Sequence, residues 1–135
     1  MFQRDYLMRQ FEQLGQVLAK AIGFKDKNDY KSAMEVLEES SEKMLKEQLD
    51  FFNNIPDEEF VEKLLVKSEN NLEYLHISAE LLFQKGDILL QQNENEKAIN
   101  LLRKSLILFE YVQMNDTTYS LDRDFKIEAI KNILN

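Results

Sequence analysis

Apolar residues recur every three or four positions along most of the chain, which is the spacing that places them on one face of an α-helix. The clearest case runs from about Leu72 to Val112, where two such segments are separated by a polar stretch at residues 91–96. This pattern predicts two antiparallel helices joined by a tight turn. Gly86 on the first and Ala98 on the second are small enough to let the two helices approach closely.

Four further segments show the helical spacing. A first helix is predicted from about Gln3 to Ile22, with Gly23 as its C-terminal stop. A second begins at residue 28 or 29 and runs for about 24 residues to Phe52. A short helix over residues 57–68 follows Pro56, which suits a first helical turn. The last helix spans about 120–134. It is expected to cover the preceding helix with Leu121, Phe125, Ala129, Ile130 and Ile133.

The composition agrees with an all-helical chain. Only three Gly and one Pro occur in 135 residues, which leaves little material for sheet turns or long loops. A chain of this length forms one domain. We therefore predict a single all-α domain over residues 1–135 with about six helices.

An internal repeat appears when the chain is shifted by 65 residues along itself. Large and small residues then coincide, and several positions are identical. In this alignment Val17, Lys20, Ala21, Phe24, Asn28, Ala33, Leu37 and Ser40 match Leu82, Lys85, Gly86, Leu89, Asn93, Ala98, Leu102 and Ser105. The alternation is that of a helical hairpin present in two copies.

These positions resemble the packing residues of the tetratricopeptide-repeat family over residues 14–47 and 79–112. The resemblance implies stacked antiparallel hairpins in a right-handed α-solenoid, with the last helix as a cap. The chain departs from the family in lacking its early aromatic residue and its closing proline, and in the spacing of 65. Whether the helix after Pro56 stacks in the array or covers the groove as a lid stays open. Separately, the opening QRDYLMRQFEQLGQVLAKAIG looks like that of a bacterial family of small helical proteins without an assigned activity.

The tetratricopeptide resemblance also implies a protein-interaction module whose concave face is lined by the first helix of each repeat. That face would carry Leu18, Ile22, Lys25, Glu80, Phe83, Asp87, Leu90 and Gln91. Of the Lys, Arg and Asn residues with which the family clamps a peptide carboxylate, only Lys25 is present. Because Glu80 and Asp87 would repel a carboxylate, the face suits an apolar or basic helix. The alternative is that Phe83 and Leu90 pack against the N-terminal helix or a second copy in a homodimer.

The formal charge of −8 argues against binding to nucleic acid or to an anionic membrane. The N-terminal segment is interrupted by charges and resembles no signal peptide, and no stretch is long and apolar enough to span a membrane. The chain has no cysteine, which fits a reducing compartment. We therefore expect a cytoplasmic protein that binds a protein, a peptide or itself.

One group of residues has the spacing of a metal site. Glu73 and His76 have the Glu-x-x-His spacing of di-iron helical bundles, and Glu80 lies one turn further on. His76 is the only histidine, so such a site would need a second copy of the chain. The simpler interpretation is a histidine at the edge of the groove. We expect a non-enzymatic interaction or adaptor protein without a cofactor; the alternatives are this metal-binding dimeric bundle and a purely structural homo-oligomer.

Overall fold

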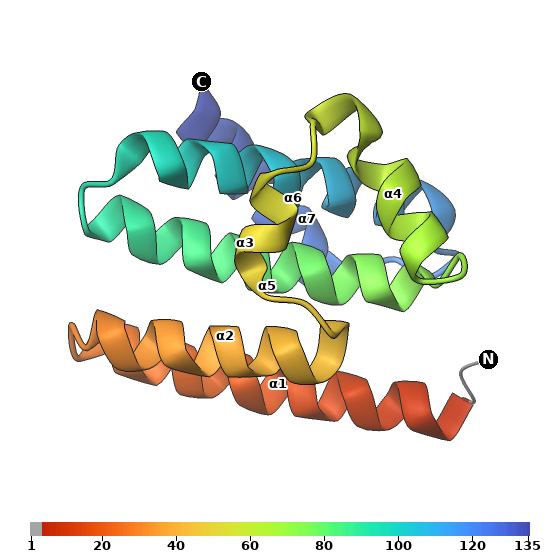
Figure 1. Ribbon diagram of the computed structural model, residues 1–135, viewed down its shortest axis with the longest axis horizontal. Helices are drawn as coiled ribbons and strands as arrows, with labels where there is room; N and C mark the ends of the chain where they lie inside the picture. The colour runs from red at the N-terminus through yellow and green to blue at the C-terminus, as the bar shows by residue number, and fades with distance from the viewer. Residues whose placement is uncertain (1–3) are drawn as a thin grey trace.

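The computed structural model describes the backbone of residues 4–135 and the side chains of residues 9–135. In this part of the chain the protein is all-α and contains no strand (Figure 1). The helices are α1 (Arg4–Asp26), α2 (Tyr30–Leu45), α3 (Leu49–Asn53), the 3₁₀ helix η1 (Asp57–Glu59), α4 (Phe60–Lys67), α5 (Leu72–Gln91), α6 (Asn95–Asn115) and α7 (Leu121–Leu134). The all-α prediction is confirmed; Gln3, the expected start of the first helix, lies outside the described residues.

Two helical hairpins, α1–α2 and α5–α6, have matching turns. Asn28 and Asn93 adopt left-handed backbone angles, with φ of 61° and 64°. Asparagine tolerates this region better than most residues. The residue after each asparagine donates its N–H to the carbonyl five positions earlier, at 2.9 Å in both turns. The repeat found in the sequence is therefore also present in the geometry of the two turns.

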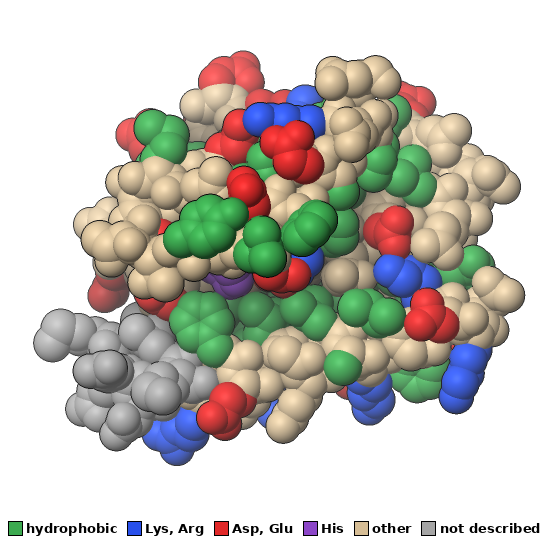
Figure 2. Space-filling model, turned by 180° about the vertical axis from the view of Figure 1, so that it is seen from behind, with side chains coloured by type: hydrophobic (Ala, Val, Ile, Leu, Met, Phe, Trp, Pro, Cys, Tyr) green, Lys and Arg blue, Asp and Glu red, His purple; other side chains and the backbone are tan. Residues whose placement is uncertain are grey.

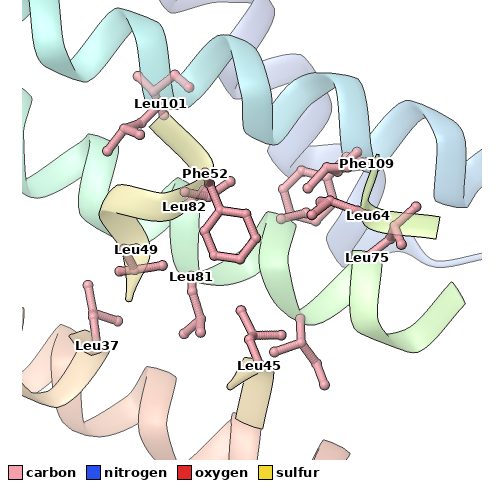
Figure 3. Packing of buried hydrophobic residues seen from close by; sticks show 14 of the residues in the cluster. Leu37, Leu45, Leu49, Phe52, Leu64, Leu75, Leu81, Leu82, Leu101 and Phe109 are labelled. Carbon is pink, nitrogen blue, oxygen red and sulfur yellow. The ribbon is translucent and has the colours of Figure 1, made fainter. Parts of the chain in front are cut away.

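The hairpins pack on one another in chain order. Helix α2 contacts both α1 and α5, and α6 contacts both α5 and α7. Helix α5 lies at the centre of this arrangement and is buried along most of its length. Figure 3 shows the core between the helices, with Leu81 and Leu82 of α5 among residues from α2, α3, α4 and α6. The right-handed solenoid implied by the tetratricopeptide resemblance stays a prediction.

The second helix is shorter than the pattern of apolar residues predicts. Instead of continuing to Phe52, α2 ends at Leu45, because Lys46 takes a left-handed φ of 60° that stops the helix. The chain then forms the separate short helix α3. In this segment Phe52 and Leu49 are fully buried, which explains why the apolar pattern continued past the break.

The segment α3–η1–α4 joins the hairpins and does not extend the stack as a full hairpin. It lies in front of α5 and α6 in Figure 1, where α4 contacts both of them. Lys104 of α6 holds it: the buried Nζ donates to Asp57 at 2.8 Å and to the Ile55 carbonyl, and lies 4.9 Å from the centre of the Phe60 ring. This segment covers the side of α5 and α6 opposite to the face formed by α1, α5 and α7.

Two predictions are wrong: where the first helix ends and which face of the last helix is buried. Helix α1 continues through Gly23 to Asp26, because the turn is set by the left-handed Asn28 and not by the glycine. Helix α7 buries Arg123, Ile127 and Ile130, whereas Leu121 and Phe125 are exposed. Of the five α7 residues expected to cover the preceding helix, Ile130 alone is buried, and Ala129 and Ile133 are also exposed.

The close approach of α5 and α6 depends on Gly86. A Cβ at this position would lie 2.8 Å from Cγ and Cδ2 of Leu102, which is fully buried. We expect Gly86→Ala to lower the free energy of unfolding by about 1–2 kcal/mol, since overpacking outweighs the helix propensity gained. Gly15→Ala in α1 is the control, because a Cβ there meets nothing within 4 Å. It should raise stability by about 0.5–1 kcal/mol. Urea unfolding measures both, and equal effects of the two substitutions would contradict the packing argument.

Candidate functional site

Helices α1, α5 and α7 form one face of the molecule, here called the α1–α5–α7 face. We define it by the eight residues predicted for the concave surface together with Phe11 and Lys126. Figure 2 shows this side: hydrophobic side chains lie along both edges of a hollow, and the single histidine is visible within it. Phe11 and Ile22 of α1 are 41% and 37% exposed, whereas Leu18, Phe83 and Leu90 are half-buried against the core. The face therefore keeps apolar surface that the fold does not bury.

A polar network joins α1 to α5 at one end of this face. Lys25 Nζ lies 2.7 Å from Asp87 Oδ2, and Gln91 donates to the same oxygen at 3.2 Å. Tyr30 in turn donates its hydroxyl to Gln91 Oε1 at 3.1 Å. Three of the predicted face residues are thus brought together by the structure. Because Lys25 is bound to Asp87, it is not presented as a clamp for a partner's carboxylate.

A second ion pair joins α5 to α7. Glu80 is only 3% exposed, and Lys126 Nζ lies 2.7 and 2.6 Å from its two carboxylate oxygens. Lys126 also donates to Asp122 at 2.9 Å and lies 6.0 Å from the centre of the Phe83 ring. Glu80 and Asp87, which were expected to repel a carboxylate, are thus each paired with a lysine. The expected repulsion of a partner's carboxylate stays a prediction.

Burial acts on both partners of the Glu80–Lys126 pair. It raises the pKa of Glu80, and the neighbouring ammonium opposes only part of that rise. For Lys126, burial alone would lower the pKa, but the attraction of Glu80 and Asp122 outweighs burial and raises it. The short contacts of Lys126 Nζ with both Glu80 oxygens are those of an ion pair. A charge pair this deeply buried is costly to break by removing one member.

A small cavity of about 180 Å³ lies beside the face, between α1, α5, α6 and the start of α7. His76 lines it, with its ring 5.6 Å from Phe11 and 6.3 Å from Phe109 in edge contacts. Burial, followed by the charges of Arg123 and Lys126, lowers the pKa of His76 to about 4. The imidazole is therefore neutral at pH 7. The interpretation of His76 as a histidine at the edge of the groove stays a prediction.

Arg123 anchors α7 at this cavity. Its buried guanidinium donates to Asp116 through Nη1 and to the Thr118 carbonyl through Nη2, both at 3.1 Å. The Thr118 N–H and then Arg123 hold the pKa of the Asp116 carboxyl below its usual range. Arg123 Nε has no hydrogen-bond partner among the described residues. The guanidinium thus fixes the turn before α7 and sets which face of that helix is buried.

The metal site considered from the sequence is not assembled within one chain. Both Glu80 oxygens bind Lys126, so this carboxylate is not open to a metal shared with Glu73 and His76. Over the part of the chain that the structure describes, no group of three histidine or acidic side chains is placed to hold an ion. A metal site shared between two copies stays a prediction.

The sequence did not identify Lys126 as a member of this face. The only sequence pattern that involves Lys126 is its spacing of four from Asp122. That spacing predicts an ordinary exposed ion pair within one helix. Its partner Glu80 lies 46 residues earlier. Phe11 was also not among the residues predicted for the face, and it is partly exposed beside His76.

Within residues 4–135, no helix is both long and apolar enough to cross a membrane. Comparisons with protein-family models, with curated protein sequences and with solved structures give no match for the chain.

Proposed function

We propose that this protein is a non-enzymatic interaction module that binds an apolar face of a helix from a partner protein on the α1–α5–α7 face. The observation that carries the proposal is the exposed apolar surface of α1 beside half-buried apolar residues of α5. Helical partners are commonly recognised by a groove of this kind, which receives apolar residues spaced three and four apart. A cytoplasmic location is part of the same proposal.

The charges on the face favour an apolar partner. Lys25 and Asp87 neutralise each other, as do Lys126 and Glu80. Neither lysine is left to bind a terminal carboxylate, so the clamp of the tetratricopeptide resemblance does not apply. What remains is apolar contact, which contributes roughly 25 cal/mol for each Å² removed from water.

Two isoleucines of equal exposure provide a matched test. Ile22 on the proposed face is 37% exposed, and Ile99 on α6 is 38% exposed. We expect Ile22→Asp to reduce capture of the bound partner at least tenfold, because a carboxylate would be buried in an apolar contact. A tenfold loss of affinity corresponds to about 1.4 kcal/mol of binding free energy. Ile99→Asp should retain it. The measurement is affinity capture from native-host lysate with mass spectrometry, for the wild type and both variants.

Light scattering on the purified proteins distinguishes the alternatives. A monomer that captures one protein in stoichiometric amount, dependent on Ile22, supports the proposal. A stable wild-type dimer that Ile22→Asp dissociates would show that the face serves self-association, as in the structural homo-oligomer. Equal capture by both aspartate variants would contradict the assignment of the face.

A further inference from the structure

The outward side of α7 carries a continuous row of apolar residues. The row takes every fourth residue of the helix, namely Leu121, Phe125, Ala129 and Ile133, and residues at this spacing form one ridge along a helix surface. Leu121 and Phe125 are 61% and 68% exposed, and Ala129 and Ile133 are exposed as well. We call these four residues the α7 ridge. They are four of the five residues that the apolar spacing predicted to cover α6.

Helix α7 is apolar on two sides, and the fold buries one of them. Ile127 and Ile130 lie in the core together with Arg123, whereas the α7 ridge stays exposed among the described residues. Single exposed apolar residues are common on protein surfaces, but a contiguous set of them marks a place where another molecule binds. A helix that is apolar all round is usually buried all round. The α7 ridge therefore has the pattern of a surface that a further molecule covers.

Carboxylates lie on both sides of the α7 ridge. Asp124 and Glu128 belong to the neighbouring row of the helix on one side, and Asp122 belongs to the row on the other side. Asp124 accepts a hydrogen bond from the hydroxyl of Tyr119 at 3.2 Å and has no cation beside it among the described residues. The Glu128 carboxylate is exposed and forms no hydrogen bond or ion pair in this part of the chain.

The cations of α7 do not neutralise these flanks. Each of them is bound to another carboxylate: Arg123 to Asp116, Lys131 to Glu110 of α6, and Lys126 to Glu80 of α5. Lys126 also donates to Asp122 at 2.9 Å, so a single lysine is shared by two carboxylates. Asp124 and Glu128 have no cation, and Asp122 has part of one. The surface beside the α7 ridge is therefore negative, as is the whole protein with its formal charge of −8.

We propose that the α7 ridge binds a basic amphipathic helix of another protein, in which lysine or arginine residues lie on both sides of an apolar stripe. Apolar side chains spaced three and four apart would pack along the ridge. The basic residues would pair with Asp124 and Glu128 on one side and approach Asp122 on the other. From Leu121 to Ile133 the ridge is about 18 Å long, at roughly 1.5 Å per residue, which suits about three turns of a bound helix.

The charge of the flanks selects this occupant. A second copy of the chain would bring the same carboxylates, and a second formal charge of −8, against the first. Anionic membranes and nucleic acids are repelled for the same reason. A basic amphipathic helix matches both the apolar row and its acidic flanks. The proposal does not depend on the proposed function, because the α7 ridge and the α1–α5–α7 face share no residue.

The apolar part of the proposal is tested with a defined peptide. The probe is a fluorescein-labelled helical peptide of leucine and lysine, about 14 residues long, with its leucines spaced three and four apart. Fluorescence anisotropy at about 150 mM salt, where attraction between distant charges is screened, measures its binding to the full chain. We expect Leu121→Ser/Phe125→Ser to weaken binding at least about tenfold, since apolar contact is lost without a change of charge. The control Val66→Ser/Ile99→Ser removes two exposed apolar residues of α4 and α6 and should stay within about twofold.

The acidic flank is tested with the same peptide. Asp124→Asn/Glu128→Gln should weaken binding at least about threefold, because two attractive charges are removed beside the bound helix. The control is Glu35→Gln/Glu39→Gln on α2, which removes two exposed carboxylates at the same spacing of four. It changes the net charge equally and should leave the affinity within about 1.5-fold of the wild type. Equal losses in the two variants would show a general charge effect and contradict the assignment of the flank.

A fluorescent side chain on the ridge reports binding at that place. The chain contains no tryptophan, so Phe125→Trp introduces a single one at an exposed aromatic position. Its emission should move to shorter wavelength when the leucine–lysine peptide is added, because the indole leaves water. The matched variant Val66→Trp, on the exposed side of α4, should show no such change. A shift in neither protein, or an equal shift in both, would contradict binding on the α7 ridge.

Four further outcomes would overturn the proposal. The first is failure of the wild type to bind the peptide up to about 1 mM. The second is a tenfold loss in Ile22→Ser with none in Leu121→Ser/Phe125→Ser, which would place the peptide on the α1–α5–α7 face. The third is a wild-type dimer, seen by light scattering, that Leu121→Ser/Phe125→Ser dissociates. The fourth is binding to phosphatidylserine vesicles that is lost in the same variant. Circular dichroism confirms that each variant remains helical.

Discussion

Lys126→Met is expected to lower the free energy of unfolding by about 3–5 kcal/mol, the usual cost of leaving a buried charge without its partner. Glu80 is 3% exposed, and Lys126 supplies both of its side-chain hydrogen bonds. Methionine keeps most of the volume of the lysine side chain but leaves the carboxylate unpaired among apolar residues. Glu80 would then either stay ionised at a high cost or take up a proton.

The same substitution on the same helix gives the control. Lys131 pairs with Glu110 at 3.8 Å, and both side chains are nearly half exposed. Because solvent screens such a pair, Lys131→Met should change stability by no more than about 0.5 kcal/mol. Adding Glu80→Gln to Lys126→Met should restore part of the loss, since the buried charge is gone. Urea unfolding at pH 7 measures all three variants. A loss in Lys126→Met no larger than that in Lys131→Met would show that the pair does not fasten α7 to α5.

The stability of the protein is expected to fall as the pH drops below about 6.5, the ordinary pKa of histidine. His76 has a folded-state pKa of about 4, so between these values the unfolded chain binds more protons than the folded chain. The stabilisation from neutral His76 is therefore fully present above pH 6.5 and is lost as the pH falls towards 4. From pH 7 to pH 5 this linkage amounts to about 2 kcal/mol.

His76→Phe isolates the contribution of this one group. Phenylalanine is aromatic and can keep the edge contacts with Phe11 and Phe109, but it does not titrate. Carboxylates such as Asp116, whose pKa is lowered in the fold, also lose their contribution at low pH. They do so in both proteins, since the Thr118 N–H and Arg123 affect Asp116 more than His76 does. The decrease in the free energy of unfolding between pH 7 and pH 5 should thus be about 2 kcal/mol smaller in His76→Phe than in the wild type. A histidine proton resonance that titrates near pH 6.5 in the folded protein would contradict the buried, neutral His76.

The helices were predictable because their signal is local. Apolar spacing identified the central α5–α6 hairpin nearly to its ends, and the matching of Asn28 with Asn93 identified two turns of the same geometry. The break after Leu45 was not predictable from apolar spacing, because the short helix α3 also buries its apolar residues. A left-handed lysine at position 46 carries no sequence signal of the kind that glycine or asparagine gives.

The candidate site was only partly predictable, because its charges are paired across the fold. The resemblance selected eight residues of α1 and α5, and the structure places Lys25 against Asp87. The sequence could not show that Glu80 pairs with Lys126, since helical spacing relates residues within one helix and not residues of α5 and α7. For the same reason the buried face of α7 was wrongly predicted: the ion pairs of Arg123 and Lys126 orient that helix, and its larger apolar residues Leu121 and Phe125 stay exposed.

The two ion pairs give the face a defined geometry. Lys25–Asp87 joins α1 to α5, and Glu80–Lys126 joins α5 to α7. Apolar residues between these connections are thus presented by three helices held in fixed relation, which lowers the entropy lost when a partner binds.

Site-directed photocrosslinking tests the α1–α5–α7 face most directly. The chain has no cysteine, so a single cysteine at position 22 or at position 99 accepts one benzophenone label at a known place. In native-host lysate we expect the label at position 22 to form one dominant adduct with a different protein, which excess unlabelled wild type abolishes. The label at position 99, on a side chain of matching exposure, should not form it. An adduct of equal yield from both positions, no adduct from position 22, or an adduct only with a second copy of this chain would contradict the proposed function.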